Sequence, residues 1–488
     1  MKRKSLKINA FLNGLKTFLN FLFPLITFPY VSRVLSVEEI GKYNFSNSLI
    51  SYFLLLAALG IDKYAIREGA KYRDNKEKFS SFASEIFSFN IISTIVSYLL
   101  LLIFLLLSKT LDRYLVCILI FSFQFFFTTL GTEWVYSIFE EYRYITIRSI
   151  LFKIISIILL FAFVKKEGDY IVYAAITVFA SVGSNVLNFF NAKKICQIKF
   201  TFKIDWRKMF KPIMIIFASN IAIQIYVNSD TTMLGYLKND YSVGIYSVAT
   251  KIYLIMKNLT GSILTVTIPR LAYLASKKTK EDYEKLLSKV ANALIILIIP
   301  SIVGVILLSR EAVLIIAGNK YLDAQLPLII LSVAILFSTF SGLFNNCVLL
   351  PYKREKVFLK SSIISAIANI VLNLILIPYF GSVGAAFTTL ISESIMASMN
   401  FFGCKDLIGK VIFNKPLKDS VVSVFCGSIG IIICCRIIKN LFSNLYVYSV
   451  TSVLLSVIIY GCILVLLKNE IVLENMKKIM HKRNRFSE

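Results

Sequence analysis

Two stretches of the sequence, about two hundred residues apart, carry nearly the same turn. Residues 25–49 read LITFPYVSRVLSVEEIGKYNFSNSL, and residues 242–252 read SVGIYSVATKI. Aligning them places Gly41 on Gly244 and Tyr43 on Tyr246. The same register, drifting only by loop-sized steps, pairs Arg67 with Arg270, KEKF at 76–79 with KEDY at 280–283, YAA at 173–175 with GAA at 384–386, and NFF at 188–190 with NFF at 400–402. The chain is therefore predicted to contain an internal repeat.

The repeat lies in a strongly apolar chain. Of 488 residues, 57% are hydrophobic and 17% are charged, and the mean hydropathy is +0.73. This composition excludes an ordinary soluble protein. Apolar runs of about twenty residues, the length that crosses a bilayer as a helix, recur along the whole sequence. Fourteen membrane helices are predicted, at 9–32, 41–60, 80–107, 114–138, 144–164, 169–191, 212–236, 243–268, 287–308, 325–350, 357–378, 381–403, 420–439 and 444–467.

The repeat relates the first six predicted helices to the next six. Because six is an even number, both halves enter the membrane in the same sense, as in the parallel-repeat plan of alternating-access transporters. We therefore predict an all-α polytopic membrane protein with two six-helix lobes, residues 1–211 and 212–410, around a central cleft. Residues 411–488 add two helices without a counterpart and a basic tail. The alternative is a duplicated scaffold without a transport role, such as a channel component.

The charge distribution predicts the topology. The chain has 54 Lys and Arg against 28 Asp and Glu, a net charge of +26. Most of the basic residues fall in the termini and in alternate loops on the side of the N-terminus, so both termini are predicted to be cytoplasmic. The first apolar segment is too long for a signal peptide and is expected to remain as a helix. The excess charge is explained by topology and by attraction to anionic lipids, so no nucleic acid partner is expected.

The sequence lacks the motifs of the common enzyme classes. Eight cysteines and a single histidine provide no metal-ligand spacing, so the cysteines are expected to be packing residues and no metal or cofactor is predicted. A Walker loop, a zinc motif, a nucleophile elbow and a histidine-based triad are also absent from the sequence. The predicted external loops are short, which disfavours a membrane polymerase or ligase with catalytic groups on a long loop. We therefore predict a protein that is not an enzyme.

Four longer stretches carry a family resemblance: FPLITFPYVSRVLSVEEIGKYNFSNSLISYF, LGIDKYAIREGAK, GTEWVYSIFEEYRYITIRSI and NSDTTMLGYLKNDYSVGIYSVATKIY. They resemble the Wzx-type oligosaccharide flippases, in the polysaccharide transporter family of the multidrug/oligosaccharidyl-lipid/polysaccharide exporter superfamily. The resemblance implies that the protein moves an oligosaccharide repeat unit linked to undecaprenyl diphosphate. The unit would pass from the cytoplasmic to the outer leaflet of the bacterial cytoplasmic membrane, for the assembly of O-antigen, capsule or exopolysaccharide. It also implies membrane lipids and the polysaccharide polymerase machinery as partners.

A diphosphate head group needs a wet, cationic path through the bilayer, whereas its lipid tail can remain in hydrocarbon. A lysine at a helix centre costs about 2.5 to 3.5 kcal/mol on insertion scales, so each such residue is expected to face a cleft or a partner. The candidates for substrate binding are Lys153, Lys257, Lys251, Lys16, Arg33, Lys42, Arg67 and Arg270. Lys153 and Lys257 lie near mid-membrane and are the best of these. Lys16 can instead extend to the cytoplasmic interface.

Carboxylates within the predicted helices leave a second function open. Asp230, Glu133 and Glu393 are candidates to bind a coupling H+ or Na+, and the membrane potential is another source of energy for transport. Asp230 lies at the depth of Lys251, so these two residues can instead neutralise each other. A cleft dominated by acids would favour a cation-coupled drug exporter of the related branch. Because the lysines within helices modestly outnumber the acids, the sequence favours an anionic cargo.

Overall fold

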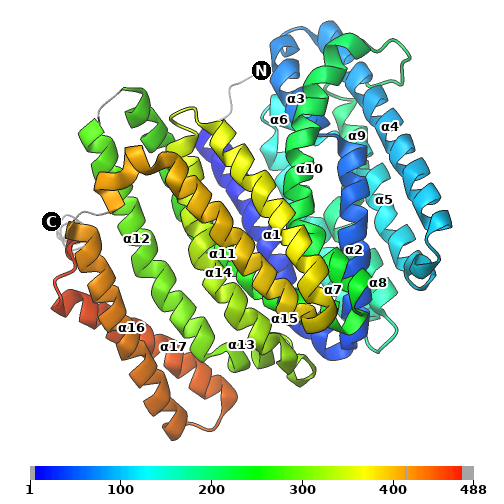
Figure 1. The fold of residues 1–488 in the computed structure, drawn as a ribbon. Coiled ribbons are helices and arrows are strands. Elements are labelled where there is room, and N and C mark those ends of the chain that lie inside the picture. Colours follow the sequence, from blue (N-terminus) through cyan, green and yellow to red (C-terminus); the bar gives the residue numbers. More distant parts are fainter. Residues whose placement is uncertain (1–5, 278–279, 413–414, 475–488) are drawn as a thin grey trace, which may run out of the picture. The chain divides into compact units, whose positions relative to one another are not determined.

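The computed structural model describes residues 6–277, 280–412 and 415–474, and every regular element in these residues is a helix (Figure 1). Among the described residues, 12 helices are long and apolar enough to cross a membrane. The predicted all-α polytopic membrane fold is therefore confirmed. The number of fourteen spans stays a prediction, because one counted stretch, Glu355–Ile408, covers two predicted helices and the first helix contributes only the shorter apolar segment Leu22–Val34.

The chain divides into two compact units, Met1–Gly244 and Ile245–Glu488. The division falls inside a helix, and the domain boundaries predicted at residues 211 and 410 stay predictions. In the first unit, α2 packs against α4, α5 and α10, α1 packs against α7, and α5 packs against α8 and α9. The helices of this unit are α1 Leu6–Val34, α2 Val37–Ala58, α3 Ile61–Gly69, η1 Ala70–Tyr72, α4 Lys76–Leu107, η2 Lys109–Tyr114, α5 Leu115–Gly131, α6 Glu133–Ile138, α7 Tyr142–Phe163, α8 Tyr170–Val178, η3 Phe179–Gly183, α9 Asn185–Ala192 and α10 Trp206–Leu237.

The second unit begins within α11 and ends with a helical hairpin. Within α15, Gly381 has non-helical backbone angles (φ 54°, ψ −128°), and it separates the two helices predicted at 357–378 and 381–403. The hairpin of α16 and α17 packs against α12 and α13 (Figure 1). The helices are α11 Asp240–Ser276, α12 Lys280–Leu307, α13 Ser309–Ile316, η4 Asn319–Ala324, α14 Gln325–Leu343, η5 Phe344–Leu349, α15 Glu355–Ile412, α16 Lys415–Leu441 and α17 Leu445–Leu466.

The repeated turn starts α2 and α11, and the two helix starts touch reciprocally. A Cβ atom on Gly41 would overlap the backbone carbonyl of Asp240, and a Cβ atom on Gly244 would overlap the backbone carbonyl of Val37. In the register of the repeat, position 37 corresponds to 240 and position 41 to 244. The contact is therefore locally two-fold, as in an isologous interface. Glycine is required at both positions because backbone packs directly on backbone.

A capping box explains the charged residues of the first turn. The backbone N–H of Glu39 donates to the Ser36 hydroxyl at 3.2 Å, and the backbone N–H of Ser36 donates to the Glu39 carboxylate at 3.0 Å. Each of these N–H groups would otherwise lack a partner at the start of α2. Glu39 of the SVEE sequence thus has a structural role at the helix N-terminus.

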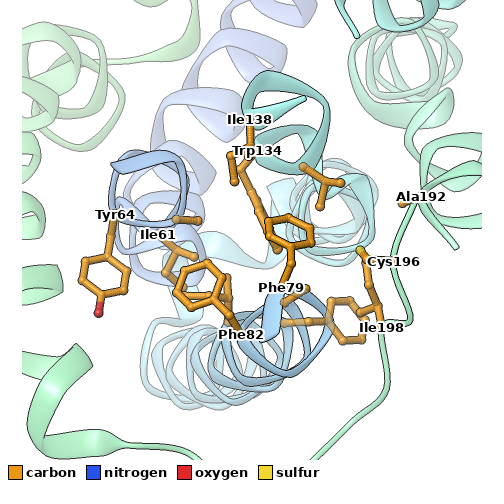
Figure 2. Packing of buried hydrophobic residues seen from close by; sticks show 14 of the residues in the cluster. Ile61, Tyr64, Phe79, Phe82, Trp134, Ile138, Ala192, Cys196 and Ile198 are labelled. Carbon is orange, nitrogen blue, oxygen red and sulfur yellow. The ribbon is translucent and has the colours of Figure 1, made fainter. Parts of the chain in front are cut away.

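An aromatic core anchors two short helices of the first unit (Figure 2). Phe79 and Phe82 of α4 pack against Trp134 of α6, and the rings of Phe82 and Trp134 lie edge to face with centroids 6.4 Å apart. Ile61 and Tyr64 of α3 belong to the same buried cluster. Both short helices are therefore held against α4 by large buried rings.

Each of these short helices follows a break in a membrane span. Leu59 and Gly60 have positive φ before α3, and Thr132 has φ 40° before α6. A left-handed threonine is strained, so the surrounding packing must hold it in place. The core shown in Figure 2 supplies that packing, because it holds α3 and α6, the helices that follow the two breaks.

Candidate functional site: a polar cavity in the first unit

A cavity of about 480 Å³ lies inside the first unit. Three irregular places in the helices border it: the break before Glu133, the π-helical segment η3 and Pro24 of α1. Such irregularities interrupt regular helix packing, and π-segments in particular occur often at functional sites. The cavity therefore results from the way three spans are broken or bent. Its polar wall includes Asp62, Glu133, Arg148, Lys153, Ser184 and Asn185.

Gly131 brings one wall of the cavity close to another. A Cβ atom at this position would lie 2.6 Å from the side-chain nitrogen of Asn185 and 2.8 Å from its Cγ. The Asn185 side chain is 6% exposed and lines the cavity. The amide of Asn185 therefore lies directly against α5 at Gly131, and a larger residue there would displace this part of the cavity wall.

Arg148 is the central feature of the site. Its side chain is 5% exposed, and its Nη2 atom lies 3.5 Å from Oε1 of Glu133. The guanidinium also lies over the ring of Tyr144, 5.8 Å from the centroid. Nε and Nη1 have no hydrogen-bond partner among the described residues. A buried cation with unsatisfied donors is costly unless an acceptor completes it, so this geometry suits an anionic ligand.

Charge in the cavity is arranged by depth. The two cations are buried, with Arg148 5% and Lys153 9% exposed. The two carboxylates are more open, since the Glu133 side chain is 39% exposed and Asp62 is exposed. The buried charges of the cavity wall are thus cationic, and its more exposed charges are anionic. This arrangement favours a ligand that places its negative charge inside.

The first unit contains several of the predicted site residues. Lys153 and Glu133 share the cavity. Lys42 is half-buried with its ammonium 5.9 Å from the Tyr170 ring centroid. Arg33 lies at the end of α1 and donates to the carbonyl of Pro29. Arg67 lies on α3 and forms an ion pair with Glu68 at 3.1 Å. Asp230 is buried in α10. The backbone of Lys16 belongs to α1, but its side chain lies outside the described residues.

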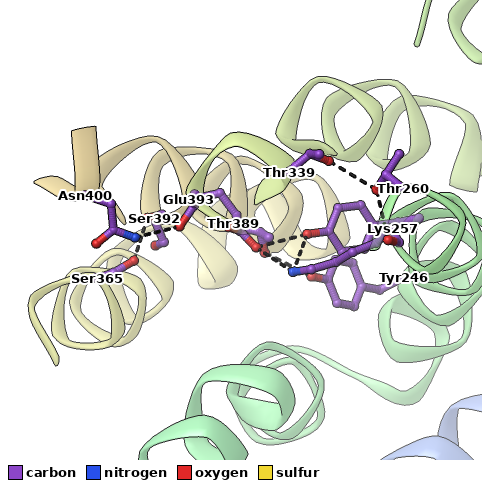
Figure 3. Close-up of polar contacts among 11 residues, drawn as sticks. Tyr246, Lys257, Thr260, Thr339, Ser365, Thr389, Ser392, Glu393 and Asn400 are labelled. Atoms are coloured by element: carbon purple, nitrogen blue, oxygen red, sulfur yellow. Dashed lines mark hydrogen bonds and ion pairs between the residues drawn. The ribbon is translucent and has the colours of Figure 1, made fainter. Parts of the chain in front are cut away.

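Lys257 of the second unit forms an ion pair that sequence reasoning did not foresee (Figure 3). Its ammonium lies 3.0 Å from Oε1 of Glu393, and the Tyr253 hydroxyl donates to the same oxygen at 3.0 Å. Lys251 and Arg270 lie on the same helix, half-buried and exposed respectively. The roles proposed for all these cations in substrate binding stay predictions, as does the pairing of Lys251 with Asp230.

Sequence reasoning missed Arg148 and Tyr253 as site residues. The signal for Arg148 was a charged residue inside an apolar run, which normally indicates a polar cavity or a partner. Arg148 lies near the start of the helix predicted at 144–164. Its burial depends on the break at Thr132 and on the packing of α6, neither of which follows from hydropathy.

The fold and the site together define a structural class. A polytopic helical protein with buried charges around an internal cavity belongs to the structural class of membrane transporters. Residues 6–275, more than half of the chain, match the family described as "Polysaccharide biosynthesis protein". The chain therefore belongs to this family.

Two relatives and two solved structures are similar over most of the chain. A protein of Escherichia coli that is named for O-antigen transport is 26% identical over 78% of this chain and 92% of its own length. The capsular polysaccharide biosynthesis protein CapF of Staphylococcus aureus is 25% identical over 75% of this chain and 90% of its own length. The lipid II flippase MurJ in an inward closed conformation matches with a TM-score of 0.61 at 19% identity, covering 91% of this chain and 97% of its own. An inward-facing multidrug transporter of the MATE family matches with a TM-score of 0.62 at 13% identity, covering 81% and 96%. The two structures share the fold with this chain.

Proposed function

We propose that the protein is a flippase that moves oligosaccharide repeat units linked to undecaprenyl diphosphate from the cytoplasmic to the outer leaflet. The observation that carries this proposal is the buried Arg148 guanidinium, which lines a cavity inside a membrane protein and has two donors without a hydrogen-bond partner among the described residues. Membership of the polysaccharide biosynthesis family and the names of the relatives support a polysaccharide precursor as cargo.

The chemistry of the cavity suits a diphosphate. Arginine forms forked, charge-assisted hydrogen bonds with phosphate oxygens, and Lys153 adds a second positive charge from the same helix. A cavity of about 480 Å³ is the size of a small-molecule site, so we assign it to the diphosphate end and not to the whole oligosaccharide. Asn185 and Ser184 supply groups that can bind phosphate or sugar hydroxyls.

The remaining parts of the proposal concern direction and setting. The protein lies in the bacterial cytoplasmic membrane with both termini in the cytoplasm, as the distribution of Lys and Arg indicates. The repeated lobes alternate in exposing the cargo to either side. The polysaccharide polymerase machinery receives the flipped unit, and an ion gradient or the membrane potential drives the cycle. No catalytic step is assigned to the protein.

Replacement of Arg148 tests the proposal in cells. A strain that lacks the protein is complemented with the wild type, Arg148→Gln or Arg148→Lys, and the leaflet of the lipid-linked unit and the surface polysaccharide are measured. Charge-assisted hydrogen bonds contribute about 1.5 to 3 kcal/mol. Since 1.4 kcal/mol is a factor of ten, we expect Arg148→Gln to weaken cargo binding about ten- to a hundredfold, with units accumulating on the cytoplasmic leaflet. Arg148→Lys is expected to be intermediate because it keeps the charge without the fork.

The controls separate this function from its alternatives. Exposed Lys415 at the start of α16 carries the same charge outside the cavity, so Lys415→Gln should complement fully. Full display by both Arg148→Gln and Lys153→Gln would refute the proposal. Units that reach the outer leaflet but are not lengthened would indicate a polymerase instead. Loss of drug resistance with normal polysaccharide would indicate a cation-coupled drug exporter.

A further inference from the structure

The crossover segment, residues 199–211, leads from α9 into the start of α10 and exposes both rings and charges. It reads KFTFKIDWRKMFK, with four aromatic residues, five basic residues and one acidic residue. Phe202 is 87% exposed, Phe210 is 52% exposed and Trp206 is 43% exposed. Large apolar side chains gathered on one surface in this way mark an interaction surface.

Three serines of α4 fix the position of the crossover segment. Their hydroxyl oxygens accept hydrogen bonds from alternate backbone N–H groups, Ser80 from Gln197 at 3.1 Å, Ser84 from Lys199 at 3.1 Å and Ser88 from Thr201 at 2.8 Å. Four helical residues rise about 6 Å, and two residues of an extended chain advance about 6.6 Å, so the two spacings match. Cys196 and Ile198, just before the segment, are buried in the aromatic core (Figure 2). The chain is therefore attached to α4 on one side and to the core on the other.

The serine ladder also gives the depth of the segment in the membrane. α4 ends at Leu107, and the sequence from Ser88 to Leu107 contains no charged residue. A hydrocarbon layer of about 30 Å corresponds to about twenty helical residues, so Ser88 lies at the boundary opposite Leu107. The ladder then places Thr201 at this boundary and Lys199 about 6 Å outside it.

A ring contact places the start of α10 at the same depth. The ring centroids of Trp206 and Phe89 lie 5.1 Å apart. Phe89 directly follows Ser88 in the sequence, so Trp206 also lies at the hydrocarbon boundary. The exposed rings of the crossover segment are therefore at the level where aromatic side chains are enriched in membrane proteins.

Basic side chains alternate with these rings. Exposed basic residues recur at every fourth position of the segment: Lys199, Lys203, Arg207 and Lys211. The single acidic residue, Asp205, caps α10 by accepting the backbone N–H of Lys208 at 3.1 Å. The segment thus combines apolar side chains with net positive charge, and together these two signals favour binding to an anionic membrane surface.

We propose that the crossover segment is a binding site for acidic phospholipids of the leaflet that it faces, which is the cytoplasmic leaflet in the proposed topology. The rings of Phe202, Trp206 and Phe210 insert among the lipids at the hydrocarbon boundary. The basic side chains bind the phosphates of headgroups that carry net negative charge, such as phosphatidylglycerol. A zwitterionic headgroup is bound more weakly, because its own ammonium repels the lysines. The site lies apart from the cavity around Arg148 and does not depend on the proposed cargo.

Quenching of tryptophan fluorescence by brominated lipids tests this site. The chain has two tryptophans, Trp134, which is 3% exposed in the core, and Trp206, which is 43% exposed. Full-length wild type and Trp206→Phe are reconstituted in mixtures of phosphatidylglycerol and phosphatidylcholine, with bromine on the acyl chains of only one of the two lipids. The difference between the two proteins reports the lipids beside Trp206. We expect a relative binding constant of about five or more in favour of phosphatidylglycerol, falling as salt is added.

Two variants and a matched control complete the design. Lys203→Gln and Arg207→Gln should each lower the preference for phosphatidylglycerol by up to about fivefold, and the double variant should bring it close to one. Both side chains are exposed, so the Tm of each variant should stay at the wild-type value. Lys109 is an exposed lysine of the same unit beyond the other end of α4, and Lys109→Gln should keep the wild-type preference.

Each contrary result has a distinct meaning. Quenching of Trp206 by neither brominated lipid would place the crossover segment in water or against a protein partner and would overturn the inference. Equal quenching by the two lipids, or a preference that the double variant retains, would show lipid contact without recognition of acidic headgroups and would overturn it as well. These results leave the flippase proposal intact, since that proposal is tested by the leaflet assay of the Arg148 variants.

Discussion

The reciprocal contact between the two helix starts predicts an unusual response to alanine. Within a helix, Gly→Ala normally stabilises by about 1 kcal/mol, because glycine is the more flexible residue in the unfolded chain. At Gly41 and Gly244 the added Cβ would overlap a backbone carbonyl, which cannot turn aside as a side chain can. Overpacking of this kind costs about 1 to 3 kcal/mol, and backbone displacement places these sites at the upper end. We expect each variant to be destabilised by about 1 to 2 kcal/mol.

The assay is thermal unfolding of the purified protein in detergent, followed by the loss of monodisperse protein on size exclusion. Gly244→Ala and Gly41→Ala should lower the Tm by several degrees and by similar amounts, because the contact is the same on both sides. The double variant should cost less than the sum of the single variants, since one shift of the helices relieves both overlaps.

Two glycines of the same chain are matched controls. Gly261 of α11 and Gly304 of α12 have no atom within 4 Å of the position where a Cβ would lie, and both have helical backbone angles. Alanine at either position should leave the Tm unchanged or raise it. A Tm of Gly244→Ala at or above the wild-type value, together with strict additivity in the double variant, would refute the reciprocal contact.

Three further predictions follow from the first unit. Trp134→Ala should destabilise the protein by about 3 to 5 kcal/mol, as expected for loss of a large core ring. It should also reduce flipping, because α6 carries Glu133 into the cavity. Trp134→Phe, which keeps a ring, is the comparison in both the thermal and the leaflet assay. Ser36→Ala removes half of the capping box and should cost about 1 kcal/mol in the same thermal assay, whereas Ser36→Asp, which can still cap, should cost little. Burial raises the pKa of the Cys196 thiol to about 12, so in a variant that retains this cysteine alone, alkylation should be slow in the folded protein and fast after unfolding. The thiol of the unfolded chain ionises at its lower ordinary pKa, so Cys196 should also make the stability of the fold fall as pH rises above that ordinary pKa. Rapid labelling of the folded protein would contradict both expectations.

The positions of the helices could be predicted closely. The segment predicted at 444–467 is α17, Leu445–Leu466, and the segment predicted at 144–164 is α7, Tyr142–Phe163. A membrane helix must bury an apolar length that matches the bilayer and must satisfy its own backbone, so hydropathy alone locates it. The interruptions within spans could not be predicted in this way. The span predicted at 114–138 contains the left-handed Thr132, a residue that does not mark a break by its type.

The charged residues show the same division between sequence and structure. Composition and hydropathy placed Lys153, Lys257, Glu133 and Glu393 inside the membrane, because each interrupts an apolar run. Their partners depend on which helices pack together. The tertiary structure enclosed Lys153 and Arg148, both from α7, in one cavity and gave Lys257 a buried carboxylate as its neighbour.

The sequence by itself therefore determined the helical membrane fold and predicted the internal repeat and charge within the bilayer, since these properties depend on local composition and on spacing along the chain. Only the tertiary structure decided which charges are buried and which buried donors lack a partner among the described residues. Arg148 is 5% exposed because α6 turns away at Thr132 and is held by the aromatic core. Burial and pairing arise from contacts between segments far apart in the chain, and the energetic cost of a charge depends on those contacts.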